Sequence, residues 1–208
     1  MILDNVASES DMLERKIFYF RKPGKANTDR VFSLVKSHAK EFGISTILVA
    51  STYGDSAARA VEFLDGCKII AVGHASGMPI DHTGSTSEPN FQPFTTENRR
   101  KVEAKGGIVL TMSHAFRGGA GSALRKKFSM RTESDIMADT LRIFGQGMKV
   151  VIEIAMMAAD AGLAPTDEPL ISIAGTGRGS DTAVVLKPVN TPDFFDMRVK
   201  EIICKPYF

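Results

Sequence analysis

Short apolar runs alternate with longer segments of helical periodicity along this chain, and that alternation restricts the fold more than any other feature. Each run is apolar at consecutive positions, which is typical of strands buried on both faces of a parallel sheet. The clearest runs are Thr46 to Ala50, Lys68 to Val72, Ile108 to Met112 and Leu170 to Ala174. Helical patterns between the runs supply covering layers. The sequence therefore predicts an α/β protein with three α/β/α layers and a mostly parallel sheet.

The helical segments carry start and stop signals. Asn27 precedes a helical pattern that stops at Gly43, and we expect Asn27 to cap that helix. Thr132 and Asp135 have the spacing of a capping box, which predicts the start of another helix. A further helix, apolar on most sides, is predicted from Gln146 to Ala161.

Extra strands are expected near both ends of the chain. They are Ile17 to Phe20, Ala183 to Leu186, and Phe195 to Cys204, the last of them antiparallel and at a sheet edge. With 208 residues and 43% hydrophobic content, the chain has the size and core of one large globular domain. We therefore expect a single domain over residues 1–208.

Composition argues against several functional classes. The net charge is only +2 and the charges are dispersed, so nucleic-acid binding is not expected. No apolar run approaches the roughly 20 residues of a membrane span, and Met1 to Asp11 lacks the regions of a signal peptide. Cys67 and Cys204 support neither a disulfide framework nor a zinc site, and the spacing of His74 and His82 does not match common zinc motifs. The expectation is a cytoplasmic protein without a metal.

Two glycine-rich segments follow predicted strands, and they are the strongest functional signal. Ser51 to Ser56 follows the strand that ends at Ala50, and Gly175 to Thr182 follows the strand that ends at Ala174. Ligands bind α/β sheets at the carboxyl ends of the strands, where glycines let amide N–H groups approach an anion. A third glycine-rich turn is expected at Ser113 to Ser122, ahead of a basic helix. This pattern predicts a phosphate-binding domain.

Neither of the first two segments matches a standard nucleotide motif. Both lack the Gly-Lys-Ser/Thr ending of a P-loop, and Ser180 stands where the dinucleotide fingerprint needs a third glycine. A looser phosphate site remains, formed by hydroxyls and amides of the first segment at a helix N-terminus, with Arg178 as a second contact. Asp55 must then turn away from the phosphate or bind a hydroxyl of the ligand. The alternative, that both segments are ordinary turns, stays open at this point.

Two other features allow more than one interpretation. The stretch Gly73 to Pro93 is long and rich in Gly, Ser, Thr and Pro, so it is either a functional lid or a disordered segment.

Lys149, Glu153 and Asp160 share one face of an otherwise apolar helix. That face either meets water, which we favour, or lines a polar cavity in the protein.

Several stretches of the chain resemble the pyruvate kinase C-terminal-domain-like proteins, and in particular a stand-alone archaeal and bacterial branch. The similarity spans roughly Ile17 to Pro206 and is most specific from Gln146 to Gly162. The matching runs are Tyr19-Phe20, Pro23-Gly24-Lys25, Asn27-Thr28, Ala50 to Ala57, Gly145 to Gly162 and Gly175 to Pro188. Tyr53 departs from the small hydroxyl residue that is usual in this family before the loop glycine.

The resemblance implies a core strand order of 3-2-1-4-5, with strand 5 antiparallel and the strand that ends at Ala50 as strand 1. Strands 1 and 4 then bring the two glycine-rich segments to one crevice. In pyruvate kinases the first segment holds a phosphate of a sugar bisphosphate effector. The catalytic barrel of that enzyme is not expected here, so pyruvate kinase activity is not expected either. The resemblance suggests flavin mononucleotide (FMN), or a similar nucleotide or sugar phosphate, as the ligand.

The expected ligand-binding residues come from several segments of the chain. They are Asn27, Thr28, Ser51, Thr52, Tyr53, Gly54, Asp55, Ser56, His74, His114, Gly175, Thr176, Gly177, Arg178, Gly179 and Thr182. An apolar slot for a flavin ring would come from Tyr53, His74, Met78 and the segment up to Phe91.

Two other functional classes remain open from the sequence. One is an enzyme that acts on a phosphorylated metabolite, with His114 or His74 as acid/base and Arg117 or Lys149 to meet negative charge. The other is a non-catalytic regulatory protein that senses a phosphorylated effector and passes the signal through an interface, which would be one between copies of the chain if the protein forms a homo-oligomer. Its interface could include Met148, Met156 and Met157, although core packing is the favoured role for these methionines.

Overall fold

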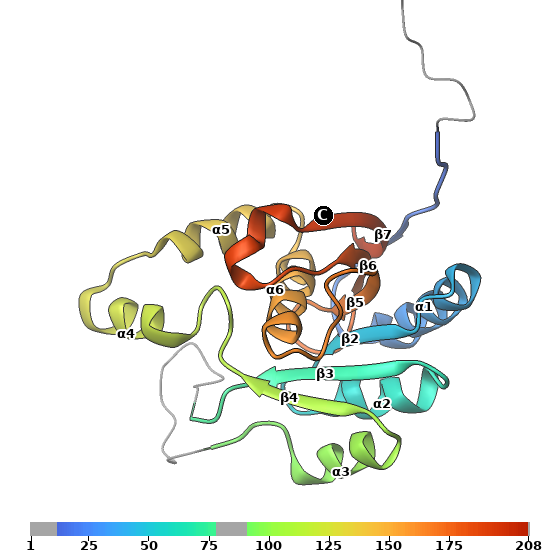
Figure 1. Cartoon of the computed structure of the whole chain (residues 1–208), viewed down its shortest axis with the longest axis horizontal. Coiled ribbons are helices and arrows are strands. Elements are labelled where there is room, and N and C mark those ends of the chain that lie inside the picture. The colour runs from blue at the N-terminus through green and yellow to red at the C-terminus, as the bar shows by residue number, and fades with distance from the viewer. Residues whose placement is uncertain (1–11, 78–90, 208) are drawn as a thin grey trace, which may run out of the picture.

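The computed structural model describes residues 12–77 and 91–207 and shows alternating strands and helices (Figure 1). Met1 to Asp11, Met78 and His82 lie outside the described residues, as does most of the expected lid, of which only 73–77 and 91–93 are included. The strands are β1 (Phe18–Phe20), β2 (Thr46–Ala50), β3 (Lys68–His74), β4 (Ile108–Met112), β5 (Leu170–Ala174), β6 (Thr182–Lys187) and β7 (Arg198–Pro206). The helices are α1 (Thr28–Phe42), α2 (Asp55–Phe63), α3 (Thr96–Ala104), α4 (Gly119–Phe128), α5 (Glu133–Arg142) and α6 (Gln146–Asp160).

The strands form one sheet in the order β1-β7-β6-β5-β2-β3-β4. β2 pairs in parallel with β3 on one side and with β5 on the other, and β3 pairs in parallel with β4. β6 runs antiparallel to β5. The expected core order 3-2-1-4-5, with an antiparallel fifth strand, is therefore confirmed as β4-β3-β2-β5-β6.

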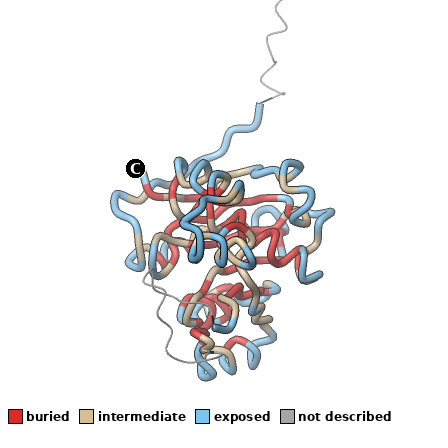
Figure 2. The backbone as a smooth tube through the Cα atoms, turned by 90° about the vertical axis from the view of Figure 1, so that its left-hand side faces the viewer, coloured by how far each residue is buried: buried red, intermediate tan, exposed pale blue. Residues whose placement is uncertain are grey.

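Helices cover both faces of the sheet, which confirms the three-layer α/β/α prediction. On one face, α1, α2 and α3 pack on the side chains of Ile47, Ile69 and Ile171. On the other face, α5 and α6 pack on Leu48, Ile70 and Leu170. Because successive strand residues point to opposite faces, each apolar strand supplies both layers of core. The buried segments accordingly run through the middle of the molecule in Figure 2.

α6 is the most deeply buried helix because it packs between the sheet and α5. Met148, Met156 and Met157 are at most 5% exposed and belong to this core. Packing is therefore their role, and these side chains are not available to an interface. Among the described residues, no helix has the length and apolar character needed to cross a membrane.

Three local expectations were wrong. β7 does not lie at the sheet edge, because β1 pairs with it in parallel and takes that position; residues 191–196 before it form a 3-10 helix instead of extending the strand. Asn27 does not cap α1 through its side chain, because a 3-10 turn runs directly into the helix and the side-chain Nδ2 of Asn27 donates to Lys22 O. The expected third glycine-rich turn is shorter, since α4 already begins at Gly119.

Candidate functional site

A large pocket lies at the carboxyl end of the central strands. At this point the strand order reverses, because β3 and β4 lie on one side of β2 whereas β5 and β6 lie on its other side. Such a reversal of strand order opens a crevice at the sheet edge. The cavity volume is about 1930 Å³, and its walls come from both glycine-rich loops, the ends of β3 and β4, and helices α4 and α6. Lysine and arginine side chains outnumber carboxylates among the lining residues.

The first glycine-rich loop joins β2 to α2 and makes one wall of the pocket. Ser51 Oγ accepts a hydrogen bond from Ala57 N at 3.3 Å, so this hydroxyl satisfies an amide in the first turn of α2. Tyr53 O accepts from Asn98 Nδ2 at 3.0 Å, and Asp55 Oδ1 accepts from the same amide at 3.1 Å. Asp55 therefore has a hydrogen-bond partner on α3, while the residue still lines the pocket.

Gly54 is required at the turn into α2, for two reasons. Its φ is +94°, a left-handed conformation that other residues rarely adopt. A Cβ at this position would also lie 2.5 Å from Asn98 Cβ and 2.6 Å from the Phe94 ring. The close cover by Phe94 and α3 thus fixes the loop so that the N-terminus of α2 faces the pocket.

The second glycine-rich loop, between β5 and β6, is held from beneath by Asp181. This carboxylate is fully buried and accepts hydrogen bonds from Gly24 N at 2.8 Å, Thr176 N at 3.0 Å and Thr182 Oγ1 at 2.8 Å. Gly179 lies so close to the segment before α1 that a Cβ would be 2.5 Å from Lys25 Cα. Asp181 therefore ties residues 24–28 and 175–182 into one rigid wall.

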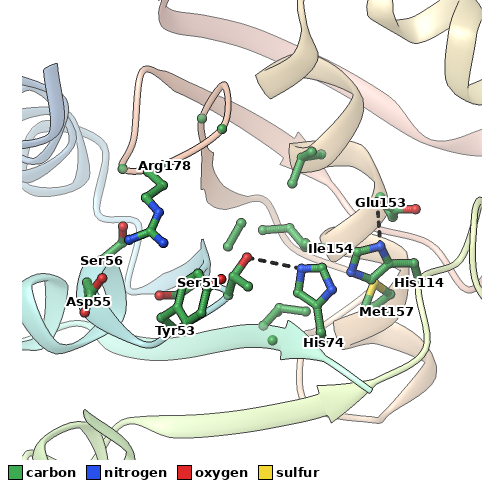
Figure 3. Close-up of a pocket in the computed structure, with 18 of the residues that line it drawn as sticks. Ser51, Tyr53, Asp55, Ser56, His74, His114, Glu153, Ile154, Met157 and Arg178 are labelled. Carbon is green, nitrogen blue, oxygen red and sulfur yellow. Dashed lines mark hydrogen bonds and ion pairs between the residues drawn. The ribbon is translucent and has the colours of Figure 1, made fainter. Parts of the chain in front are cut away.

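The two loops face one another across the pocket. The Arg178 guanidinium lies 4.6 Å from the centre of the Tyr53 ring, and in Figure 3 the side chain reaches from the second loop toward Asp55 and Ser56. Within the described part of the chain, no acceptor is found for the amide N–H groups of Asp55 and Ser56, or for those of residues 177–179. Unpaired amides at a helix N-terminus beside an arginine form an anion-binding arrangement.

His74 and His114 form a stacked pair deeper in the pocket, with ring centres 4.3 Å apart. His74 Nε2 is 3.1 Å from Thr52 Oγ1, which links the pair to the first loop. Burial is the main cause that lowers the pKa of His74 to about 4, and the adjacent His114 is the second. Burial also lowers the pKa of His114, against the opposing effect of Glu153. Both rings are therefore neutral near pH 7.

Lys149 and Glu153 on α6 do not face water, contrary to the expectation that we favoured from the sequence. Their side chains are 4% and 2% exposed, and they pair with each other in the wall of the pocket. Glu153 Oε1 also accepts from Phe116 N at 3.0 Å, and Oε2 lies 4.0 Å from His114 Nδ1. The loop after β4 covers this turn of α6, so the charges face a polar cavity. Of the three charged residues on this face, only Asp160, about two turns further along α6, is exposed.

Most of the predicted site residues meet at the pocket, and the rest support it. Those that line it are Thr28, Ser51, Thr52, Tyr53, Asp55, Ser56, His74, His114, Gly175, Gly177, Arg178 and Gly179. Asn27, Gly54, Thr176 and Thr182 are not among the lining residues. Thr182 is buried under the loop, and Gly54 faces Phe94 and Asn98.

Sequence reasoning missed Lys25, Asp181 and Arg142. Lys25 and Arg142 line the pocket and Asp181 supports it. Asp181 had a detectable signal, because an acidic residue between a glycine-rich loop and an apolar strand needs partners when it is buried. Arg142 had none, since its place depends on how α5 packs against α6.

Comparison with known families identifies the family of this chain. The sequence model of the family described as pyruvate kinase, alpha/beta domain, matches residues 29–186. The chain belongs to this family. The matched region begins in the first turn of α1 and ends in β6, so it includes both glycine-rich loops, whereas β1 and β7 lie outside it.

Proposed function

We propose that this protein binds a phosphorylated small molecule, with the phosphate at the N-terminus of α2 and beneath Arg178. The observation that carries the proposal is the set of amide N–H groups at Asp55, Ser56 and residues 177–179, which have no acceptor among the described residues and face one pocket from two loops. A dianion there would gain from the helix dipole and from charge-assisted hydrogen bonds. The excess of cationic side chains in the lining acts in the same direction.

FMN is a candidate of this class that the pocket fits. Its phosphate would meet the amides of Ser56 and the guanidinium of Arg178. The pocket lining also includes Val72, Ile154 and Met157, apolar side chains of the kind that a flavin ring needs. When bound, FMN would supply hydride or single-electron chemistry. A nucleotide or sugar phosphate could use the same phosphate position.

The test begins with the purified protein. A visible absorption spectrum shows whether a flavin co-purifies, and a fluorescence titration with FMN measures affinity. Arg178→Gln should weaken binding of FMN or another phosphorylated ligand about ten- to hundredfold, because a charge-assisted hydrogen bond contributes about 1.5 to 3 kcal/mol. Arg30→Gln, on α1 outside the pocket lining, is the matched control. If FMN and a panel of sugar phosphates show no affinity, the proposal fails.

A second candidate function is acid/base catalysis on the bound phosphorylated metabolite. The observation that favours it is the neutral His74–His114 pair beside the buried Glu153 carboxylate. A carboxylate near Nδ1 favours the tautomer in which Nε2 is free to accept a proton. His114→Ala should then abolish turnover while the affinity for the phosphorylated ligand changes little. Unchanged turnover for every substrate found would remove His114 from this role.

We place the protein in the cytoplasm. Cys67 and Cys204 are both free thiols, and Cys204 is buried, which suits a reducing compartment.

A further inference from the structure

The outward face of α5 exposes isoleucines where a surface helix normally carries polar side chains. Helix α5 lies at the periphery of the molecule (Figure 1). Ile136 is 63% exposed, and Ile143, which directly follows the helix, is 78% exposed. The inward face of α5 is already in use, because Ala138 is buried and Leu141 packs on the core around α6. The two isoleucines therefore add nothing to that core.

The exposed isoleucines line a shallow groove, which we call the α5 groove. Its volume is about 490 Å³, and its lining residues are Arg131, Ile136, Asp139, Thr140 and Ile143. None of these five residues lines the large pocket at the carboxyl end of the strands. From another face of the same helix, Arg142 lines that pocket. The α5 groove is thus a surface distinct from the proposed phosphate site.

Further apolar side chains flank the α5 groove at both ends. Met130 precedes Arg131 and is 55% exposed, and Phe144 follows Ile143 and is 56% exposed. At about 200 Å² for a large side chain, these two residues and the two isoleucines expose about 500 Å² together. A stable interface buries about 800 Å² per partner, of which about 60% is apolar. The apolar area around the α5 groove is therefore what one side of a stable interface needs.

The charges in the α5 groove are balanced, which restricts the kind of partner. Arg131 forms an ion pair with Asp139, and Asp139 also accepts from Arg142. A nucleic acid or an anionic lipid surface needs an excess of free cations, whereas the single arginine that lines this groove is paired. A protein surface that offers one acid and one base at matching positions fits better.

The spacing along α5 makes the groove complementary to itself. Ile136 and Ile143 are two helical turns apart, and Thr140 lies between them. When two α5 helices meet antiparallel about a two-fold axis at Thr140, Ile136 of each copy contacts Ile143 of the other. The same axis brings Asp139 of each copy beside the paired arginine of the other, so ion pairs can form across the contact. Antiparallel helix dipoles also attract one another.

We infer that the α5 groove is a homodimer interface, in which two copies of this chain pair through antiparallel α5 helices around Thr140. Each copy covers the apolar side chains that the other exposes, and Thr140 is small enough to let the two helices approach at the axis. The inference does not rest on the proposed phosphate site, because the two surfaces share no lining residue.

Sedimentation equilibrium of the full chain tests the dimer. The wild type should be dimeric at about 100 μM. Ile136→Asp and Ile143→Asp each place two carboxylates in a two-fold interface, and each should raise the dissociation constant of the dimer at least about a hundredfold. Ile17→Asp is the matched control, since Ile17 is an exposed isoleucine next to β1 at the sheet edge. Circular dichroism and thermal unfolding check that each variant folds.

Disulfide crosslinking tests the position of the axis. Thr140→Cys, in a Cys67→Ser background, should give a covalent dimer on oxidation with copper phenanthroline, because a residue on a two-fold axis meets its own copy. The remaining thiol, Cys204, is buried. Glu133→Cys is the control on the same helix. In the antiparallel arrangement the two copies of residue 133 lie about 20 Å apart along the helices, so this variant should not crosslink.

Four results would overturn the inference. They are a monomeric wild type at about 100 μM, a dimer that survives both isoleucine variants, a dimer that Ile17→Asp dissociates, and crosslinking through position 133 as efficient as through position 140. Co-sedimentation of a monomeric wild type with phosphatidylserine vesicles, lost in Ile143→Asp, would identify a lipid surface as the occupant and would equally overturn it. The titrations with FMN and sugar phosphates decide the phosphate site independently of all these results.

Discussion

The unusual protonation of His74 makes the stability of the fold depend on pH in a way that can be measured. In the folded protein, burial and His114 lower the pKa of His74 to about 4 from an ordinary value of 6.5. Between these values the unfolded chain binds a proton that the folded chain does not. Stability therefore falls as the pH is lowered through this window, and it is fully retained above the unfolded pKa.

The magnitude follows from the size of the shift. Each pKa unit corresponds to about 1.4 kcal/mol, which gives about 3 kcal/mol for the full window. Because His74 is only partly buried, solvent screening reduces this, and we expect about 2 kcal/mol between about pH 7.5 and about pH 4.5. His74→Gln should abolish that part of the loss, while the protonation of carboxylates affects both proteins equally.

Urea denaturation followed by circular dichroism is the suitable assay, because the chain contains no tryptophan. The free energy of unfolding is measured at both pH values for the wild type and for His74→Gln. Thr52→Val is the matched control, since it removes the hydrogen-bond partner of His74 but keeps the imidazole. NMR titration of the His74 ring gives its pKa directly. Equal pH dependence in wild type and His74→Gln, or a ring pKa near 6.5, would refute the reasoning.

Three further predictions concern the support of the pocket. Asp181→Asn places an amide against three donors and should lower the free energy of unfolding, measured by urea denaturation, by about 2 kcal/mol. Binding of phosphorylated ligands should weaken as well. Unchanged stability would show that Asp181 does not hold the loop. Gly147→Ala should lower the free energy of unfolding by about 2 kcal/mol or more, because a Cβ would overlap the Thr182 hydroxyl. Its control is Gly121→Ala, which should be neutral or slightly stabilising because the nearest neighbour of the new Cβ would be 3.6 Å away. Similar losses at both glycines would contradict this reasoning. Thr95→Ala removes the cap that accepts from Asn98 N at 3.2 Å and should lower stability by about 1 kcal/mol, and a smaller change than 0.3 kcal/mol, on the order of experimental error, would count against the cap.

The sequence by itself determined the layered architecture. Runs such as Leu170 to Ala174 are apolar at every position but one, and only a strand covered on both faces buries such a run. Glycines after two of these strands indicated where the chain must turn tightly, and the parallel arrangement then placed both loops at one edge. These features depend on residues close together in the chain, so they can be read without the fold.

Only the tertiary structure decided which polar residues serve the pocket. Lys149 and Glu153 have the spacing of an ordinary surface pair, and it is the loop carrying Phe116 that buries them. Asp181 acts through Gly24, 157 positions away, and Arg142 reaches the pocket because α5 packs on α6. The same holds for β1, which displaced β7 from the edge by pairing with it. The physical reason is that burial and charge pairing depend on contacts between distant segments, and periodicity within one segment carries no information about them.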